Sequence, residues 1–323
     1  GVFASLYGSV MLQTPEDRQR IKGIIINKFR GDLRLFEDGR RMIEELCQVP
    51  VLGVVPYLED IGVEDEDSVV LDKKQRSAKD DKVNVAVVKL RHLSNFTDFN
   101  AIEQDHRLNV YYTTEKEQLL RADIIILPGC KATIDDLRHL KEEGVADTIR
   151  EAHRQGKTIF GICGGYQMLG MSIDDPRQTE GDAIHIEGIG LLPMRTVMGE
   201  KKITCQTEFT LATNSNDMCK DGVKMRGYEI HQGISTPIDK STYKPLTIKA
   251  DGTPDGCIAD SHCMGTYLHG CLDNAAMVDY LIGKKNTESF DFAEYKEQHY
   301  NRLADHIRKH VDMAKVYDIL SRQ

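Results

Sequence analysis

The sequence predicts an α/β protein in which two α/β regions follow one another, joined by a charged linker. Short apolar runs rich in β-branched residues alternate with helical stretches, which is the repeating unit of a parallel sheet. Several of the runs are apolar at nearly every position, as in strands covered on both faces. Residues 71–84 (LDKKQRSAKDDKVN) are dense in charge and lack periodicity, so we place a linker there.

The first region, residues 1–80, is expected to contain two strands, KGIIINKF and VPVLGVVPYL, separated by a helix over 33–46. A preceding helix is expected to begin at Pro15, because Thr14 and an acidic pair flank that proline as helix starts do. The opening GVFASLYGSVML is apolar from its second residue. We therefore expect the chain to be part of a longer protein.

The second region, residues 81–285, predicts a doubly wound sheet. Four buried strands are expected at VNVAVVKL, NVYYTT, ADIIILPGC and KTIFGIC, with helices over 115–121, 132–143 and 145–155. Beyond residue 185 the pattern changes to shorter strands and turns. Residues 286–323 are expected to form a helical extension, with Leu303, Ile307, Val311 and Ala314 on one face.

The composition disfavours several classes of function. Apolar residues make up 40% and charged residues 29% of the 323, which is ordinary for a globular protein, and no apolar run approaches the roughly 20 residues of a membrane span. The formal net charge of −9 disfavours a nucleic-acid partner. The eight cysteines form no CxxC pair, which predicts free thiols in the cytoplasm and no bound metal.

One glycine cluster suggests chemistry. In GICGGYQMLG, Cys163 follows an expected strand and precedes an expected helix, the arrangement of a nucleophile elbow at the carboxyl edge of the sheet. Helix amides at that point lower the pKa of a thiol and can hold an oxyanion. From the residues alone, a structural cysteine at a tight turn remains the alternative.

Two further segments favour the nucleophile. ILPGCKAT ends the neighbouring strand and brings Gly129 to the same edge, where its amide could complete an oxyanion hole with that of Gly164. GTYLHGC supplies His269 as the base that a cysteine nucleophile needs.

Across nearly its whole length the chain resembles the cobyric acid synthases, the glutamine-dependent amidases of the corrin pathway. The segments that carry the resemblance include IKGIIINKFRGD, LSNFTDF, ILPGCKATIDDL, GICGGYQMLG, GYEIHQG and GTYLHG. The resemblance implies a class I glutamine amidotransferase domain, preceded by the C-terminal part of an ATP-binding domain of the dethiobiotin synthetase kind. The sister a,c-diamide synthases, cell-wall precursor amidotransferases and a noncatalytic scaffold are the alternatives.

The resemblance also implies roles. Cys163 would attack the glutamine carboxamide, His269 would move the proton, and Gly165 and Gln167 would help to hold the substrate. The released ammonia would amidate four carboxylates of adenosylcobyrinic acid a,c-diamide, activated with ATP and Mg²⁺ in the complete enzyme. Asn27 and Pro56 correspond to loops that frame the nucleotide base, although a strand-end cap explains Asn27 nearly as well. No tightly bound cofactor is expected in this chain.

Two departures from the family pattern stand out. Class I amidotransferases usually carry an acidic residue two positions after the base, where this chain has Cys271. A backbone carbonyl or a residue elsewhere would then orient the imidazole, and Glu229 and His231 are candidates, with a structural role as the alternative. The sequence also contains no GxxxxGK[ST] P-loop, so we expect an upstream segment or a second chain to supply it.

Overall fold

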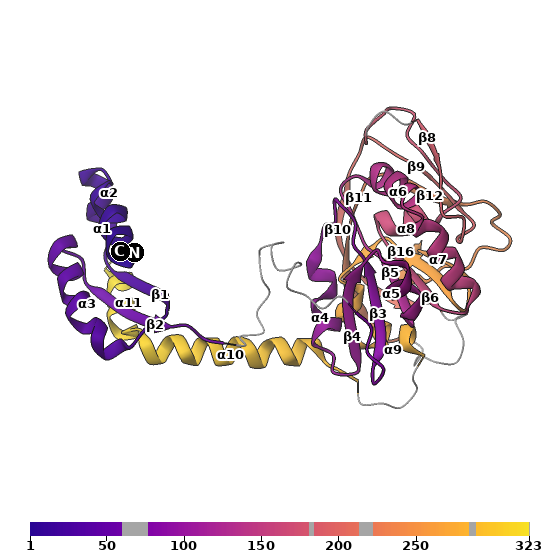
Figure 1. Ribbon diagram of the computed structural model, residues 1–323. Coiled ribbons are helices and arrows are strands. Elements are labelled where there is room, and N and C mark those ends of the chain that lie inside the picture. Colours follow the sequence, from indigo (N-terminus) through magenta and orange to yellow (C-terminus); the bar gives the residue numbers. More distant parts are fainter. Residues whose placement is uncertain (60–76, 181–183, 213–221, 284–288, 323) are drawn as a thin grey trace. The chain divides into compact units, whose positions relative to one another are not determined.

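The computed structural model describes residues 1–59, 77–180, 184–212, 222–283 and 289–322, which belong to two compact units. One unit comprises residues 1–63 together with 293–323, and the other comprises residues 64–292 (Figure 1). The linker expected at 71–84 lies outside the described residues up to position 76. The boundaries expected at residues 80 and 285 stay predictions.

The first unit contains the two expected strands as a parallel pair, β1 (Ile24–Phe29) and β2 (Val51–Pro56). Three helices accompany them: α1 (Val2–Met11), α2 (Pro15–Arg20) and α3 (Leu33–Cys47). Thr14 caps α2 by accepting a hydrogen bond from the amide of Asp17, as its sequence predicts. The apolar residues of α1, α3 and both strands form this unit's own small core around Ile43, which is fully buried.

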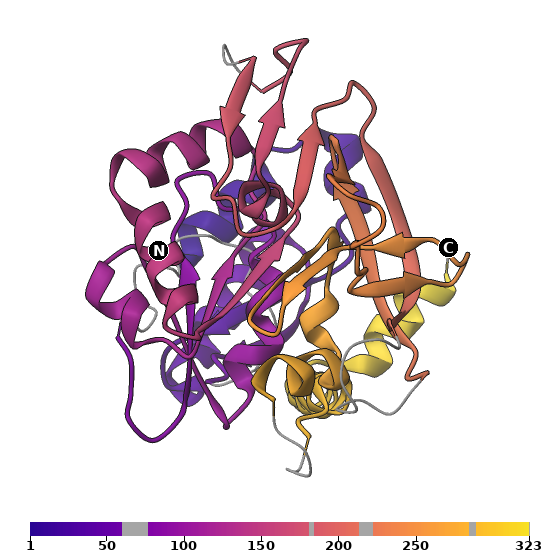
Figure 2. The same cartoon turned by 90° about the vertical axis from the view of Figure 1, so that its right-hand side faces the viewer.

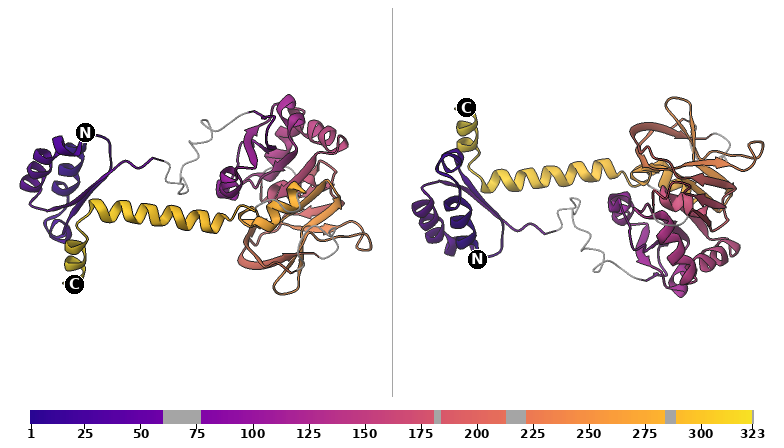
Figure 3. Two further views of the ribbon diagram at one scale, coloured as in Figure 1. Left: turned by 90° about the horizontal axis from the view of Figure 1, so that it is seen from below. Right: turned by 90° about the horizontal axis from the view of Figure 1, so that it is seen from above.

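The C-terminal residues return to this first unit. Helices α10 (Phe292–His310) and α11 (Met313–Ser321) are separated at Val311, so the prediction of one apolar face running from Leu303 to Ala314 was wrong there. Val311 instead forms a bridge with Gly53 on β2, and the amide of Asp312 donates to Leu52 at 2.7 Å. Asp312 then caps α11, which is why the helix restarts. Figure 3 shows these yellow helices beside the indigo strands.

The second unit is built on a six-stranded sheet in the order β15-β16-β6-β5-β3-β4. Its strands are parallel except for β15 (Cys257–Asp260), which runs against β16 (Cys263–Thr266). The four predicted strands are β3 (Val83–Val88), β4 (Leu108–Thr113), β5 (Ile124–Leu127) and β6 (Thr158–Ile162), and they confirm the doubly wound mixed sheet.

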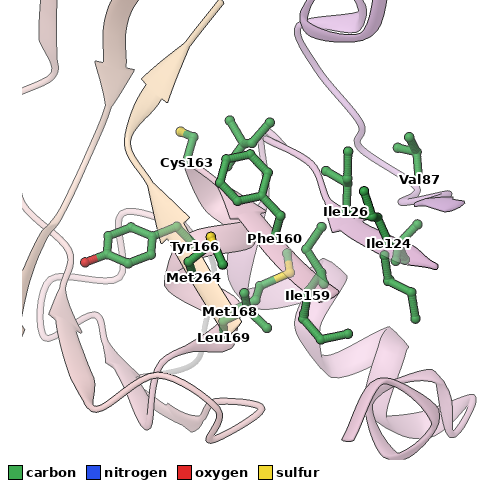
Figure 4. Packing of buried hydrophobic residues seen from close by; sticks show 14 of the residues in the cluster. Val87, Ile124, Ile126, Ile159, Phe160, Cys163, Tyr166, Met168, Leu169 and Met264 are labelled. Atoms are coloured by element: carbon green, nitrogen blue, oxygen red, sulfur yellow. The ribbon is translucent and has the colours of Figure 1, made fainter. Parts of the chain in front are cut away.

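Helices cover both faces of this sheet. The predicted helices are α5 (Lys116–Arg121), α6 (Thr133–Glu142) and α7 (Val145–Arg154), and they neighbour one another and α8 (Gly164–Leu169). The helical turns η2 (Phe96–Phe99) and η3 (Cys271–Asp273) form a second group with α4 (Asn100–Gln104) and α9 (Ala275–Ile282). Apolar residues between these layers form the main core, and Figure 4 shows Cys163 at its margin with the sulfur pointing away from Phe160.

Two smaller sheets complete the second unit (Figure 2). One has the order β14-β13-β10-β11-β17 and contains β14 (Pro254–Asp255), β13 (Thr247–Lys249), β10 (Ile203–Leu211), β11 (Met225–His231) and β17 (Leu268–His269). The other contains β12 (Ile234–Pro237), β9 (Met194–Val197), β7 (Ser172–Asp174) and β8 (His185–Glu187). Strand β17 follows β16 directly, so the chain passes from the main sheet into the smaller one just before His269. In the described part of the chain no helix is both long and apolar enough to cross a membrane.

Candidate active site

Cys163 occupies a sharp turn between strand β6 and helix α8. Its backbone dihedrals are φ 51° and ψ −110°, outside the regions that a residue with a side chain normally adopts. Hydrogen bonds fix this conformation from both sides, because the Cys163 amide donates to Thr266 at 2.9 Å and its carbonyl accepts from the amide of Gln167 at 3.0 Å. Strained residues that the surrounding structure holds in place are concentrated at functional sites. The elbow predicted from the sequence is present.

The glycines around Cys163 make this turn possible. A Cβ atom at Gly161 would lie 2.7 Å from the backbone of Tyr166, and one at Gly165 would lie 2.0 Å from the carbonyl oxygen of Leu127. Both distances are far below a van der Waals contact. Gly165 therefore allows α8 to lie directly on β5, and its contact is with the strand backbone.

His269 lies at the end of β17 with its side chain fully buried. Its Nδ1 atom is 2.6 Å from Oδ2 of Asp98, while Oδ1 of the same carboxylate accepts a hydrogen bond from the Gly270 amide at 2.9 Å. The ring of Tyr228 stacks on the imidazole with centroids 5.2 Å apart. The imidazole is thus held at one edge and on one face.

The structure brings Cys163, His269 and Gly129 together. A Cβ atom at Gly129 would lie 2.8 Å from Cε1 of His269 and 3.6 Å from Cβ of Cys163. A Cβ atom at Gly164 would lie 3.3 Å from the amide nitrogen of Cys130, so the two glycine loops predicted to form the oxyanion hole are neighbours. A side chain at position 129 would therefore collide with the imidazole.

The electrostatics of His269 favour its charged form. Burial by itself would lower the pKa of His269, but hydrogen bonds to Asp98 and then to Cys163 outweigh it and raise that pKa to about 10. An imidazolium at neutral pH beside a cysteine can stabilise the thiolate, which is the nucleophilic form of the side chain. The arrangement can therefore support attack on an acyl carbon followed by proton return.

Gln167 lies on α8 and is 2% exposed. Its Nε2 atom donates to the carbonyl of Gln232 at 2.8 Å and to the hydroxyl of Tyr267 at 3.2 Å. These bonds tie α8 to the turn after β11. A contact between Gln167 and a substrate stays a prediction, and the amide oxygen is the atom with which it could be made.

Glu229 and His231 lie on β11 on either side of Ile230, whose carbonyl is 3.6 Å from the sulfur of Cys163. The Glu229 carboxylate binds Lys249 at 3.1 Å, and His231 donates from Nδ1 to the carbonyl of Gly233. His231, whose Nε2 lies 3.9 Å from the carboxylate, lowers the pKa of Glu229 together with Lys249, despite the burial of the carboxylate. Both side chains are thus engaged with groups other than His269, and Asp98 holds the imidazole.

The remaining sequence candidates are Cys271, Asn27 and Pro56. Cys271 is fully buried, and burial raises the pKa of its thiol well above the ordinary value. Asn27 and Pro56 belong to the other unit, where they stand near the carboxyl ends of β1 and β2. Among the residues that the structure describes, no group of three or more histidine, cysteine or acidic side chains could hold a metal ion.

Sequence reasoning did not find Asp98 or Asn95, although both lie in the segment LSNFTDF. Asn95 adopts a left-handed conformation with φ 55°, and its Nδ2 atom is 3.0 Å from Nδ1 and 3.1 Å from Nε2 of His269. The position of this segment in the chain could have indicated that it belongs to the site. The segment follows β3, and the carboxyl ends of parallel strands β3, β5 and β6 meet at the edge that also carries Gly129 and Cys163.

Comparison with known proteins gives a consistent result. Residues 84–277 match the family described as CobB/CobQ-like glutamine amidotransferase domain. The chain is 50% identical over 326 residues to a cobyric acid synthase of Phocaeicola vulgatus and 51% identical over 325 residues to one of Bacteroides fragilis, in each case covering 99% of this chain and 64% of the relative. It is 40% identical over 338 residues to a cobyric acid synthase of Alkaliphilus metalliredigens, covering 99% of this chain and 67% of that protein. The chain thus spans about two thirds of the length of these relatives.

Proposed function

The chain belongs to the cobyric acid synthase family and carries its CobB/CobQ-like glutamine amidotransferase domain, and from this we propose that residues 64–292 hydrolyse glutamine to deliver ammonia. The observation that carries the proposal is the convergence of Cys163, His269 and Gly129 at one edge of the sheet. The ammonia is used to amidate peripheral carboxylates of a corrin.

In the first step the Cys163 thiolate attacks the carboxamide carbon of glutamine and a tetrahedral oxyanion forms. Backbone amides of the loops at Gly129 and Gly164 stabilise the negative charge. The carbon–nitrogen bond then breaks, and His269 gives its proton to the departing nitrogen, which leaves as ammonia. Water hydrolyses the glutamyl thioester with the neutral His269 as base, so that glutamate leaves and the thiolate and imidazolium are restored.

The acceptor half of the reaction is proposed from the family. Adenosylcobyrinic acid a,c-diamide is the expected acceptor, and ATP with Mg²⁺ activates its carboxylates, because a free carboxylate is a poor electrophile. The nucleotide loops would include Asn27 and Pro56. The topology of this unit supports a nucleotide site there. Phe29 pairs with Pro56 at the carboxyl ends of two parallel strands, where ligand crevices open in such folds.

A glutamine-analogue electrophile tests the first half of the proposal. We expect it to modify Cys163, to lose that reaction in Cys163→Ser, and to keep it in Cys130→Ser, whose thiol lies next to Gly164 and is the matched control. Modification of Cys130 in place of Cys163 would overturn the site, and no modification of either would favour a noncatalytic scaffold. Mass analysis of corrin precursors supplied to the complete enzyme tests the acceptor.

A further inference from the structure

The carboxylate that contacts His269 comes from a distant part of the chain. Asp98 lies 171 residues before His269, in the turn that follows strand β3. We infer that Asp98 is the positioning residue for the base of glutamine hydrolysis and takes the place of the acid that the amidotransferase pattern puts at position 271. The inference rests on the proposed function, because it assigns a role within that reaction.

The geometry of the contact defines the role. One carboxylate oxygen of Asp98 accepts a hydrogen bond from Nδ1 of His269 at 2.6 Å, and the other accepts one from the Gly270 amide at 2.9 Å. The ring and the backbone turn behind it are therefore fixed by one side chain. With Nδ1 bonded to Asp98, Nε2 is the ring nitrogen through which the base would exchange a proton with the thiol, as a Cys–His pair requires.

The turn that carries Asp98 is itself attached to the site. The Ser94 amide donates to the carbonyl of Gly129 at 3.1 Å, and Leu93 forms a bridge with Cys130. The position of Asp98 is thus set relative to the glycine loop beside Cys163. Tyr228 stacks on the imidazole, and Nδ2 of Asn95 lies within 3.1 Å of both ring nitrogens, so tilting of the ring is restricted as well.

Other side chains near the site are committed elsewhere. Cys271 is a fully buried thiol whose pKa is raised by burial and by the charge of Asp98, so it stays neutral. Glu229 is bound to Lys249, and Asp255 accepts hydrogen bonds from the hydroxyl of Thr266 and the amide of Tyr267. Asp98 is 2% exposed, and its interaction raises the pKa of His269 against the effect of burial.

The test replaces the charge and keeps the shape. In Asp98→Asn the side-chain amide cannot serve both proton donors as a carboxylate does, and we expect the rate of Cys163 modification and of glutamine hydrolysis to fall about 10²- to 10⁴-fold at pH 7, as for other triads that lose this charge. Loss of the Asp98 charge lowers the pKa of His269, so the fall in the rate of Cys163 modification at alkaline pH should begin at a lower pH. Asp98→Glu, which restores a carboxylate, should return the onset of this fall toward the wild-type pH.

Asp273→Asn is the matched control, because Asp273 is an acid close after His269 in sequence and is exposed at the surface. It should react within about twofold of wild type. A folded Asp98→Asn variant with the wild-type rate and pH profile would overturn the inference. Failure of wild-type Cys163 to react would instead overturn the proposed function, so the two outcomes are distinguishable.

A second measurement needs no variant at position 98. Nitrogen-15 NMR of histidine-labelled wild-type protein reports the protonation of each ring nitrogen. We expect His269 to carry a proton on Nδ1 from pH 6 to pH 8. An imidazole with an unprotonated Nδ1 in that range would contradict the role of Asp98 even if Asp98→Asn failed to fold.

Discussion

Replacing alanine by glycine usually lowers the stability of a folded protein, but the strained backbone of Cys163 predicts the opposite at this position. We expect Cys163→Gly to be more stable than Cys163→Ala. Both variants lack the thiol, so their difference reports the Cβ atom alone. A residue with a Cβ atom at φ 51° and ψ −110° carries strain of about 1–3 kcal/mol, which glycine relieves. Glycine also lowers the free energy of unfolding by about 0.4–1 kcal/mol, because it increases the conformational entropy of the unfolded chain.

The expected net difference is therefore between about 0 and about 2.6 kcal/mol in favour of Cys163→Gly, with a midpoint of about 1.3 kcal/mol. Urea unfolding followed by far-ultraviolet circular dichroism and tyrosine fluorescence would measure it, since the chain has no tryptophan. Hydrogen exchange in β6 would assign the transition to the second unit. The control is Ala152→Gly in α7, where an ordinary helical backbone should make glycine the less stable residue by about 1 kcal/mol or more.

A Cys163→Ala variant that is more stable than Cys163→Gly would refute this reasoning if Ala152→Gly behaves as expected. The turn at Cys163 would then be relaxed, and the hydrogen bonds to Thr266 and Gln167 would not be holding an unfavourable conformation.

Three other predictions follow from the geometry of the two units. Gly165→Ala should destabilise the second unit by about 1–3 kcal/mol, because its Cβ would lie 2.0 Å from the Leu127 carbonyl oxygen; Gly199→Ala, which meets open space, should change the unfolding free energy by less than about 0.5 kcal/mol. The pKa of His269 is raised from 6.5 to about 10, so the stabilisation from its charge should be complete below pH 6.5 and lost as the pH rises through 10. The difference in unfolding free energy between wild type and Asp98→Asn should shrink over that interval, and a difference constant with pH would contradict the assignment. Deleting residues 293–323 removes the backbone contacts to Leu52 and Gly53, so hydrogen exchange in β2 should accelerate at least about tenfold. The rate of Cys163 modification should stay unchanged. Unaltered exchange in β2 would show that the first unit does not need the tail.

The sequence predicted the parts of this fold that depend on local pattern. The strands from Ile24 to Ile162 are short runs that are apolar at most positions, and burial in a parallel sheet is the arrangement that such runs favour. Cys163 was found because its glycines mark a turn, and His269 because cysteine nucleophiles need a base. Glycine patterns report backbone geometry directly, so the loop at Gly129 was also found.

Contacts between distant segments were harder to predict. Nothing in the spacing of Asp98 and His269 indicates that they touch, because the contact arises from strand order in the sheet. The break at Val311 is also hidden, since the apolar positions continue through it at helical spacing. The structure places a backbone bridge there, and a bridge to β2 leaves no trace in a helical pattern.

The return of the C-terminal helices to β2 has a consequence for the order in which the protein is made. Pro56 and His306, which share a hydrogen bond in the first unit, are 250 residues apart in the chain. At about 5–20 residues per second, a ribosome needs on the order of 10–50 s to pass from one to the other. All of the amidotransferase unit emerges during that time. Strands β1 and β2 are therefore synthesised long before helices α10 and α11, which contact β2. A chaperone that binds the two strands during this interval would raise the yield of folded protein.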